Sequence, residues 1–197
     1  NQYPLASEVN GGYISGMTTW MPKNSIGHLS EDASCLCSPA MYREFGLPYT
    51  SKLLENYGYA MMHVHSLGRA CIPLIAGMKK IGTFQLSGDP NQPDAIDVYR
   101  KYADVLAGRT VLLDMTPEQL TENLDFLKGK KTIVNLEAES PAAAEKAMDA
   151  LSDLKGCEAH STVILSQVDE GMFGKLGVNI TCETAPHYLT MDDGDLE

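Results

Sequence analysis

The sequence has few positive charges and no long apolar run. Fifteen Lys and Arg stand against 26 Asp and Glu in 197 residues, a formal net charge of −11 with His neutral. Nucleic acids and anionic membrane surfaces attract clustered positive charge, so this balance argues against both as partners. No apolar stretch approaches the roughly 18 residues needed to cross a bilayer, and no basic-then-apolar leader opens the chain. We therefore expect an acidic, soluble, cytoplasmic protein.

Several motifs of cofactor binding and catalysis are also absent. The chain has no G-x-G-x-x-G pattern, no P-loop and no G-x-S-x-G elbow, so we expect no nucleotide cofactor. The five cysteines are an odd number without repeated short spacing, which excludes a secreted disulfide framework. Reduced and mostly buried thiols are the simpler interpretation, and redox chemistry at Cys35 and Cys37 is the alternative.

Short apolar segments alternate with helical segments along the chain. Continuous apolar strands are typical of a parallel sheet that is covered on both faces. Their alternation with helices predicts βα units with right-handed crossovers. The expected strands are 59–65, 81–86, 110–113, 132–136, 160–165 and 178–182, and the expected helices are 39–57, 93–107, 116–127, 140–154 and 167–176. Residues 1–27 are expected to be loop with one strand at most.

The starts of the expected helices carry a common signal. Ser38-Pro39, Thr116-Pro117 and Ser140-Pro141 each place a capping hydroxyl before a proline, whose missing N–H is harmless at the first helical position. Gln119 completes a capping box with Thr116. These starts support the alternation of strands and helices independently of the apolar pattern.

His63-Val64-His65 is the sharpest local feature of the sequence. Residues two apart in a strand face the same side, so both imidazoles can converge on one ion or substrate. Neutral imidazole is a good zinc ligand, and two of them need one or two further donors. A pair of hydrogen-bonded, partly buried histidines is the alternative.

Other polar side chains end the neighbouring strands or lie in strand-to-helix loops. Parallel strands bring such residues to one rim of the sheet. Several polar residues on one rim indicate a polar pocket more strongly than any one of them does alone. Each residue taken alone is also explained as a capping or solvated loop residue. The rim residues are Glu31, Asp32, Gln85, Asp114, Asn135 and Glu137.

The segment from Glu31 to Tyr49 resembles the "ED-A…SPEMYREF-LPY" block of uroporphyrinogen decarboxylase-like proteins, and the likeness extends over about 12–154. The resemblance implies a (β/α)8 TIM barrel, of which this chain holds the C-terminal part, and a methyltransferase or decarboxylase. It implies a small-molecule substrate or a corrinoid protein as partner, and zinc as cofactor. His65 stands where the methyltransferase branch carries Cys, so Glu137 would supply the third metal ligand beside His63 and His65.

On this interpretation the site residues divide into two further groups. Asp32, His63 and Gln85 are the expected catalytic residues. The expected substrate-binding residues are Glu31, Tyr13, Trp20, Asp114 and Asn135.

The last segment resembles a different family. Gly177 to Thr190 is similar to the "G-x-x-V-T-C-E-T-x-P-H-Y-L" strand of allantoinase and dihydroorotase, with His160 and His187 in the order of two metal ligands. We therefore expect a partial barrel over 1–155 and an additional βαβ-like segment over 156–197, with Gly156 at the seam. The resemblance implies a second function, metal-dependent hydrolysis of a cyclic amide.

A third hypothesis is a non-enzymatic half-barrel that serves as an interaction module. The expected βα units are too few for a barrel of about 250 residues, and the chain begins at Asn1 rather than Met, so we expect missing upstream strands. An open half-barrel leaves sheet edges exposed, which favours a homo-oligomer.

Overall fold

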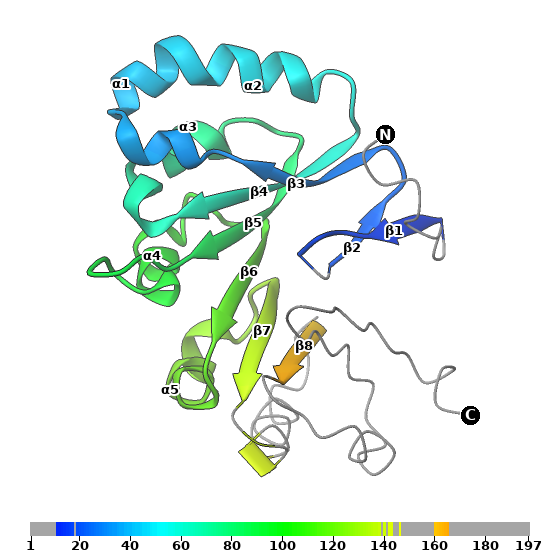
Figure 1. Cartoon of the computed structure of the whole chain (residues 1–197), viewed down its shortest axis with the longest axis vertical. Coiled ribbons are helices and arrows are strands. Elements are labelled where there is room, and N and C mark those ends of the chain that lie inside the picture. Colours follow the sequence, from blue (N-terminus) through cyan, green and yellow to red (C-terminus); the bar gives the residue numbers. More distant parts are fainter. Residues whose placement is uncertain are drawn as a thin grey trace. The chain divides into compact units, whose positions relative to one another are not determined.

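The computed structural model of the chain describes residues 11–17, 19–138, 140, 142–143, 146 and 160–165. It forms two compact units, a first unit over Asn1–Val111 and a second unit over Leu112–Glu197. Within each unit, parallel strands alternate with helices (Figure 1). The prediction of an α/β protein is confirmed, whereas barrel closure is not seen among the strands of the described ranges.

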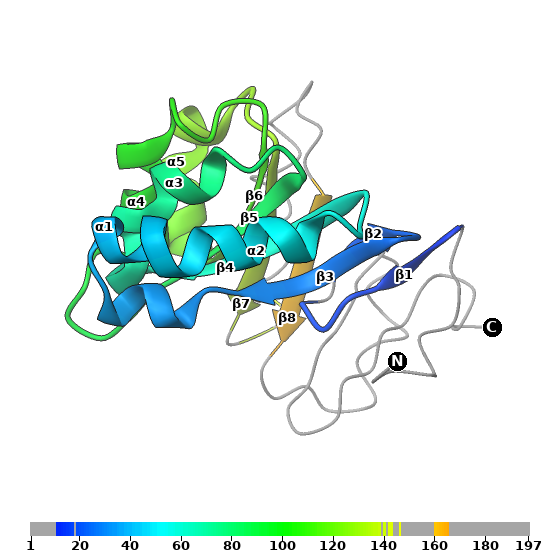
Figure 2. The ribbon, with the colours of Figure 1, turned by 90° about the horizontal axis from the view of Figure 1, so that it is seen from above.

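Three parallel strands form the main sheet of the first unit, in the order of the sequence. The strand β3 (Ser25–Ser30) pairs with β4 (Tyr59–His65), and β4 pairs with β5 (Ile81–Ser87), as Figure 2 shows from above. The register sets His63 beside Ser30 on one side and beside Gln85 on the other. This register places their backbones level with one another near the carboxyl ends of the strands.

An antiparallel hairpin precedes β3. Its strands are β1 (Gly12–Ile14) and β2 (Trp20–Pro22), and Tyr13 pairs with Met21 at its centre. The sequence pattern of residues 1–27 predicted loop with one strand at most, so the hairpin and the whole of β3 go beyond that prediction. Each strand of the hairpin is only three residues long, which is too short to show the alternation on which a strand prediction depends.

Helical segments of the first unit follow its strands. The regular helix α4 (Ala95–Tyr102) follows β5, whereas 3-10 and π-helical turns accompany the α-helices after β3 and β4. The other helical segments are η1 (Asp32–Leu36), α1 (Pro39–Met41), the π-helical turn η2 (Tyr42–Gly46), α2 (Leu47–Leu54), η3 (Ser66–Cys71) and α3 (Ile72–Ala76).

The expected helix 39–57 is helical over 39–54, with a π-helical turn in its middle. Gly46 lies against the ring of Tyr42, where an added Cβ would approach a ring carbon at 2.6 Å. Pro48 follows in the first turn of α2, where its missing N–H is tolerated. The π-helical turn η2 takes up the irregularity between α1 and α2.

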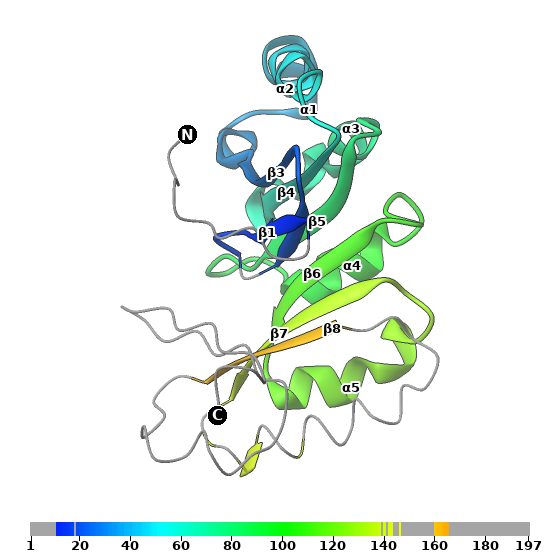
Figure 3. The same cartoon turned by 90° about the vertical axis from the view of Figure 1, so that its right-hand side faces the viewer.

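The second unit contains most of β6 (Thr110–Met115), then α5 (Pro117–Leu127), β7 (Thr132–Ala138) and β8 (His160–Leu165). The strands β7 and β8 pair in parallel, and α5 packs beside β7 (Figure 3). The five strands expected between 59 and 165 are therefore present, and the expected strand 178–182 and helix 167–176 lie outside the described residues. The expected seam at Gly156 and most of the expected helix 140–154 lie outside the described residues.

Side-chain caps begin the helices as the sequence predicts. The Ser38 hydroxyl accepts a hydrogen bond from the Met41 N–H at 3.3 Å. The Thr116 hydroxyl accepts from the Gln119 N–H at 3.2 Å, and the Gln119 side chain accepts from the Thr116 N–H at 3.0 Å. Both caps satisfy backbone donors that the first helical turn leaves unpaired.

The core of the first unit lies on both faces of the sheet. Every residue from Ala60 to Val64 is buried, and Phe84 and Ile72 are fully excluded from solvent. Burial on both faces explains why β4 has a continuous apolar sequence rather than an alternating one. Within the part of the chain that the structure describes, no helix has the length and apolar character needed to cross a membrane.

The contact between η1 and η3 depends on a glycine. A Cβ on Gly68 would lie 2.3 Å from the Ser34 hydroxyl oxygen, a side chain that is itself buried. We predict that Gly68→Ala lowers the free energy of unfolding by about 1–3 kcal/mol, because the two segments must separate.

Urea denaturation measures this loss against Gly16→Ala, where an added Cβ meets nothing within 4 Å. Equal stability of the two variants would contradict the close contact.

Candidate metal centre

Three potential ligands converge at the carboxyl end of the sheet in the first unit. His63 and His65 are on the last residues of β4, and Asp32 follows β3 at the start of η1. Their ligand atoms all lie within 4.8 Å of one another. The sequence predicts a function for all three residues, His63 as a catalytic residue and metal ligand, His65 as a metal ligand and Asp32 as a catalytic residue.

The separations of the ligand atoms suit an ion better than direct hydrogen bonds. The Nε2 atom of His65 lies 3.5 Å from Asp32 Oδ1, and Nε2 of His63 lies 3.8 Å from the same oxygen. Hydrogen bonds between such atoms are about 2.7–3.2 Å long. Metal bonds of about 2.0–2.2 Å in tetrahedral geometry place ligand atoms roughly 3.3–3.6 Å apart. Small adjustments would therefore bring all three atoms onto one ion.

Acceptors hold the other nitrogen of each histidine. Nδ1 of His63 contacts the Gln85 amide oxygen across the β4–β5 pair, and Nδ1 of His65 lies 2.8 Å from Asp89 Oδ1. An acceptor at Nδ1 keeps the proton there and leaves the Nε2 lone pair free. Both Nε2 atoms point toward Asp32, as metal ligation requires.

Asp89 is itself held in place by the loop after β4. Its Oδ2 accepts hydrogen bonds from the Leu67 N–H at 2.8 Å and from the Ser66 hydroxyl at 3.1 Å. Burial alone would raise the pKa of Asp89, but these donors and His65 outweigh it and lower the pKa. Asp89 is therefore an ionised acceptor with a fixed position.

The three ligands differ in exposure. The Asp32 side chain is 64% exposed, that of His65 is 30% exposed and that of His63 is 11% exposed. The centre is thus anchored in the sheet by His63 and open to solvent at Asp32. Three protein ligands on an open edge leave a coordination position for water or substrate.

His28, on β3, is a neighbour of the candidate centre. The sequence pattern did not predict this neighbour. Its ring centroid lies 5.4 Å from that of His63, edge to face. Burial lowers the pKa of His28, His63 lowers it further and Asp32 opposes the shift. His28 lies four residues before Asp32, and this spacing indicates a shared site only when residues 25–30 are known to form a strand.

The carboxylate of Glu31 is engaged within the fold. It accepts hydrogen bonds from the Tyr42 hydroxyl at 2.8 Å and from the Thr50 hydroxyl. Burial and then the Glu31 charge strongly raise the pKa of Tyr42. Glu31 thereby ties the start of η1 to η2 and α2.

The other expected site residues lie away from the three ligands or in the second unit. Tyr13 donates to the Ser25 carbonyl at 3.0 Å, and Trp20 on β2 is 46% exposed. In the second unit, Asn135 donates to Asp114 at 2.9 Å. Glu137, the expected third metal ligand, falls in β7, and its side chain lies outside the described part of the structure.

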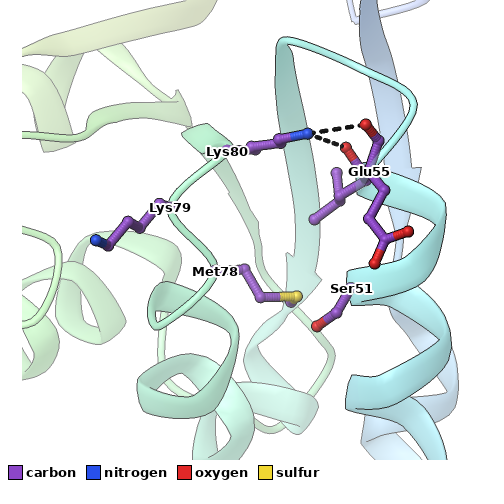
Figure 4. Close-up of a pocket in the computed structure, with 6 residues that line it drawn as sticks. Ser51, Glu55, Met78, Lys79 and Lys80 are labelled. Carbon is purple, nitrogen blue, oxygen red and sulfur yellow. Dashed lines mark hydrogen bonds between the residues drawn. The ribbon is translucent and has the colours of Figure 1, made fainter.

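A hollow of different character lies at the opposite end of the strands in the first unit. Residues at the end of α2 and in the turn before β5 line it (Figure 4). Lys80 donates to the Leu54 carbonyl at 2.8 Å and to the Glu55 carbonyl at 3.0 Å, which caps α2. Lys80 therefore stabilises the fold. The side chains that could ligate a metal gather instead at the carboxyl end of the strands.

The first unit is thus an α/β sheet with a candidate metal centre at its carboxyl edge. A family model described as the C-terminal part of a domain of unknown function, DUF1846, matches residues 112–191. A UPF0371 protein of Clostridium botulinum strain Alaska E43 is 44% identical over 57 residues, which are 29% of this chain and 11% of that protein. A UPF0371 protein of Corynebacterium efficiens is 28% identical over 148 residues, 74% of this chain and 27% of that protein.

The chain thus spans about a tenth to a quarter of the length of these relatives. A UPF0371 protein of Clostridium tetani is 56% identical over 45 residues, 23% of this chain and 9% of that protein. No solved structure matches the chain.

These similarities correct the family expected from the sequence. The chain resembles UPF0371 proteins, so the interpretation as a uroporphyrinogen decarboxylase-like methyltransferase or decarboxylase is wrong. The residues of the supposed family block have local structural reasons: Ser38 caps α1, Tyr42 binds Glu31 and Pro48 begins α2. Such helix-start chemistry recurs in unrelated α/β proteins, and the corrinoid partner loses its basis with the family.

The two alternative functions are overturned by the same similarities. The segment that resembled cyclic-amide hydrolases falls within the DUF1846 match and lies outside the described residues. The half-barrel interaction module presupposed the barrel of the wrong family. Neither alternative is retained.

Removal of the Glu31 carboxylate tests its structural role. We predict that Glu31→Ala lowers the free energy of unfolding by about 1–3 kcal/mol, because two partly buried hydroxyls lose their acceptor. Chemical denaturation of this variant is compared with Glu44→Ala, which removes an exposed carboxylate on η2. Equal losses in the two variants would show that Glu31 does not tie these segments together.

Proposed function

We propose that this chain binds a divalent transition-metal ion, zinc in the first instance, through Asp32, His63 and His65. The observation that carries the proposal is the convergence of two histidine Nε2 atoms and one carboxylate oxygen, with both Nδ1 atoms held by acceptors. Structural ion pairs seldom fix the far nitrogen of each ring in this way, whereas metal-ligating histidines almost always have such an outer partner.

The donor set is chemically suited to zinc. Neutral imidazole nitrogen and carboxylate oxygen are standard zinc ligands, and a site with three protein ligands and one open position is the catalytic type. An ion bound there would polarise a substrate oxygen or lower the pKa of a bound water. We therefore infer that the chain is part of a metal-dependent enzyme that acts on a small-molecule substrate.

The barrel belongs to the same proposal. Parallel strands in sequential order, β3-β4-β5 in one unit and β7-β8 in the other, are the order found in a (β/α)8 barrel. The functional edge of such a barrel is the carboxyl end of its strands, where His63 and His65 lie. A crystal structure of a full-length relative would test the closure, and an open doubly wound sheet would contradict it.

Metal binding is the direct test. We predict one zinc or cobalt ion per chain in calorimetric titration, and loss of that ion in Asp32→Ala, His63→Ala and His65→Ala. Cobalt bound by nitrogen and oxygen ligands lacks the near-ultraviolet charge-transfer band of thiolate ligation, so its spectrum separates this centre from the cysteines.

His28→Ala is the matched control, since His28 contacts the His63 ring but lies outside the ligand group. Retention of the ion by His63→Ala and His65→Ala, or a thiolate spectrum, would refute the proposed centre.

The outer partners should tune the affinity without abolishing it. We predict that Asp89→Ala weakens zinc binding roughly 10–100-fold, because the His65 ring loses the acceptor that fixes its tautomer. Competition with a chromogenic chelator measures the change. Asp97→Ala, an exposed carboxylate in the first turn of α4, is expected to bind like the parent chain. Similar affinities for both variants would exclude Asp89 as a positioning residue.

A further inference from the structure

The two segments beside the candidate centre carry three cysteines. Cys35 lies in η1 and Cys37 directly after it, and Cys71 is the last residue of η3. The segments η1 and η3 contact each other, and the close approach of Gly68 to Ser34 holds them together. Cysteines far apart in the sequence are thereby brought side by side.

Cys37 and Cys71 are the pair that faces each other. The two side chains share a hydrogen bond, and the Cys37 thiol also lies 4.0 Å from the Ser34 carbonyl oxygen at the η1–η3 contact. Cys71 is fully buried and Cys37 is half-buried. Cys35 has another partner, because the Gly68 N–H donates to its sulfur. Cys37 is therefore the cysteine of the first segment that shares a side-chain hydrogen bond with Cys71.

We propose that Cys37 and Cys71 form a dithiol site that a small-molecule disulfide oxidises to an intramolecular disulfide. The Cys37 thiolate attacks one sulfur of the reagent and expels a thiolate, which leaves a mixed disulfide on Cys37. The Cys71 sulfur then loses its proton and attacks Cys37, and the second thiolate leaves. The two cysteine thiols are oxidised, the reagent is reduced to two thiols, and both protons are transferred to those products.

The order of attack follows from accessibility. Cys37 is the half-exposed partner that a reagent can reach, whereas Cys71 is shielded from solvent. Burial, with the Cys37 contact, raises the pKa of Cys71 to about 11, so that thiol stays protonated until the mixed disulfide forms beside it. Cys71 thus acts as the resolving cysteine.

The cross-link would act on the metal centre. Asp32 begins η1 and His65 immediately precedes η3, so a bond between Cys37 and Cys71 ties together the two segments that carry these ligands. A tie of this kind reduces the freedom that metal binding must remove. This consequence rests on the proposed metal binding, whereas the disulfide itself does not.

Glutathione disulfide is the probe for the cross-link, used on the full chain. We expect the number of reactive thiols in denaturant to fall from five to three per chain, since two sulfurs pair. Tryptic mapping should join the peptide 24–43 to the peptide 70–79. The Cys37→Ser variant should lose this link, and the Cys35→Ser variant should keep it. A link that persists in Cys37→Ser, or that is lost in Cys35→Ser, would overturn the pairing.

A second measurement separates the disulfide from its effect on the centre. Zinc affinity, measured by chelator competition on oxidised chains, should be several-fold higher for the parent than for Cys37→Ser. Equal affinities with the disulfide formed would overturn the coupling alone. Absence of zinc binding in both chains would refute the metal centre while the mapped disulfide stands.

Discussion

The fixed orientation of two imidazole rings is the constraint on which the candidate centre depends. His63 is oriented by Gln85, its register partner on β5, and His65 by Asp89 in the loop that follows β5. Both acceptors come from the β5 side, so the Nε2 atoms turn toward Asp32 on the β3 side. The pairing of three neighbouring strands therefore determines where a ligand can bind. The η1 and η3 turns only complete the surroundings of that position.

The strands from residue 59 onward and the helix caps could be predicted because their signals are local. Continuous apolar runs such as 59–65 identify buried parallel strands, and Ser-Pro or Thr-Pro pairs identify helix starts. Because side chains alternate between the two faces of a strand, the strand 59–65 also predicted that His63 and His65 share one face. These features need only neighbouring residues, so one sequence suffices for them.

The rest depends on pairing between distant residues. The strand β3 has a polar, glycine-containing sequence, and only its register with β4 makes it a strand. The partners of Asp89, His65 and Leu67, are more than twenty residues away, so no local pattern indicates its role. The error in family arose in the same region, since residues that cap and pack helices in many α/β proteins were taken for a family signature.

The charges at the centre favour a bound cation over an empty ion-pair network. Asp32 and Asp89 bring two negative charges to two imidazoles whose rings lie 4.6 Å apart. Protonation of both rings would balance the charge, but two imidazolium ions at that separation repel each other. The two Nε2 atoms also lie 3.5 and 3.8 Å from Asp32 Oδ1, which is longer than a good hydrogen bond between nitrogen and oxygen. A divalent ion would balance the same two charges from a single point, and neutral imidazole rings with outer partners at Nδ1 are the form in which histidine ligates a metal.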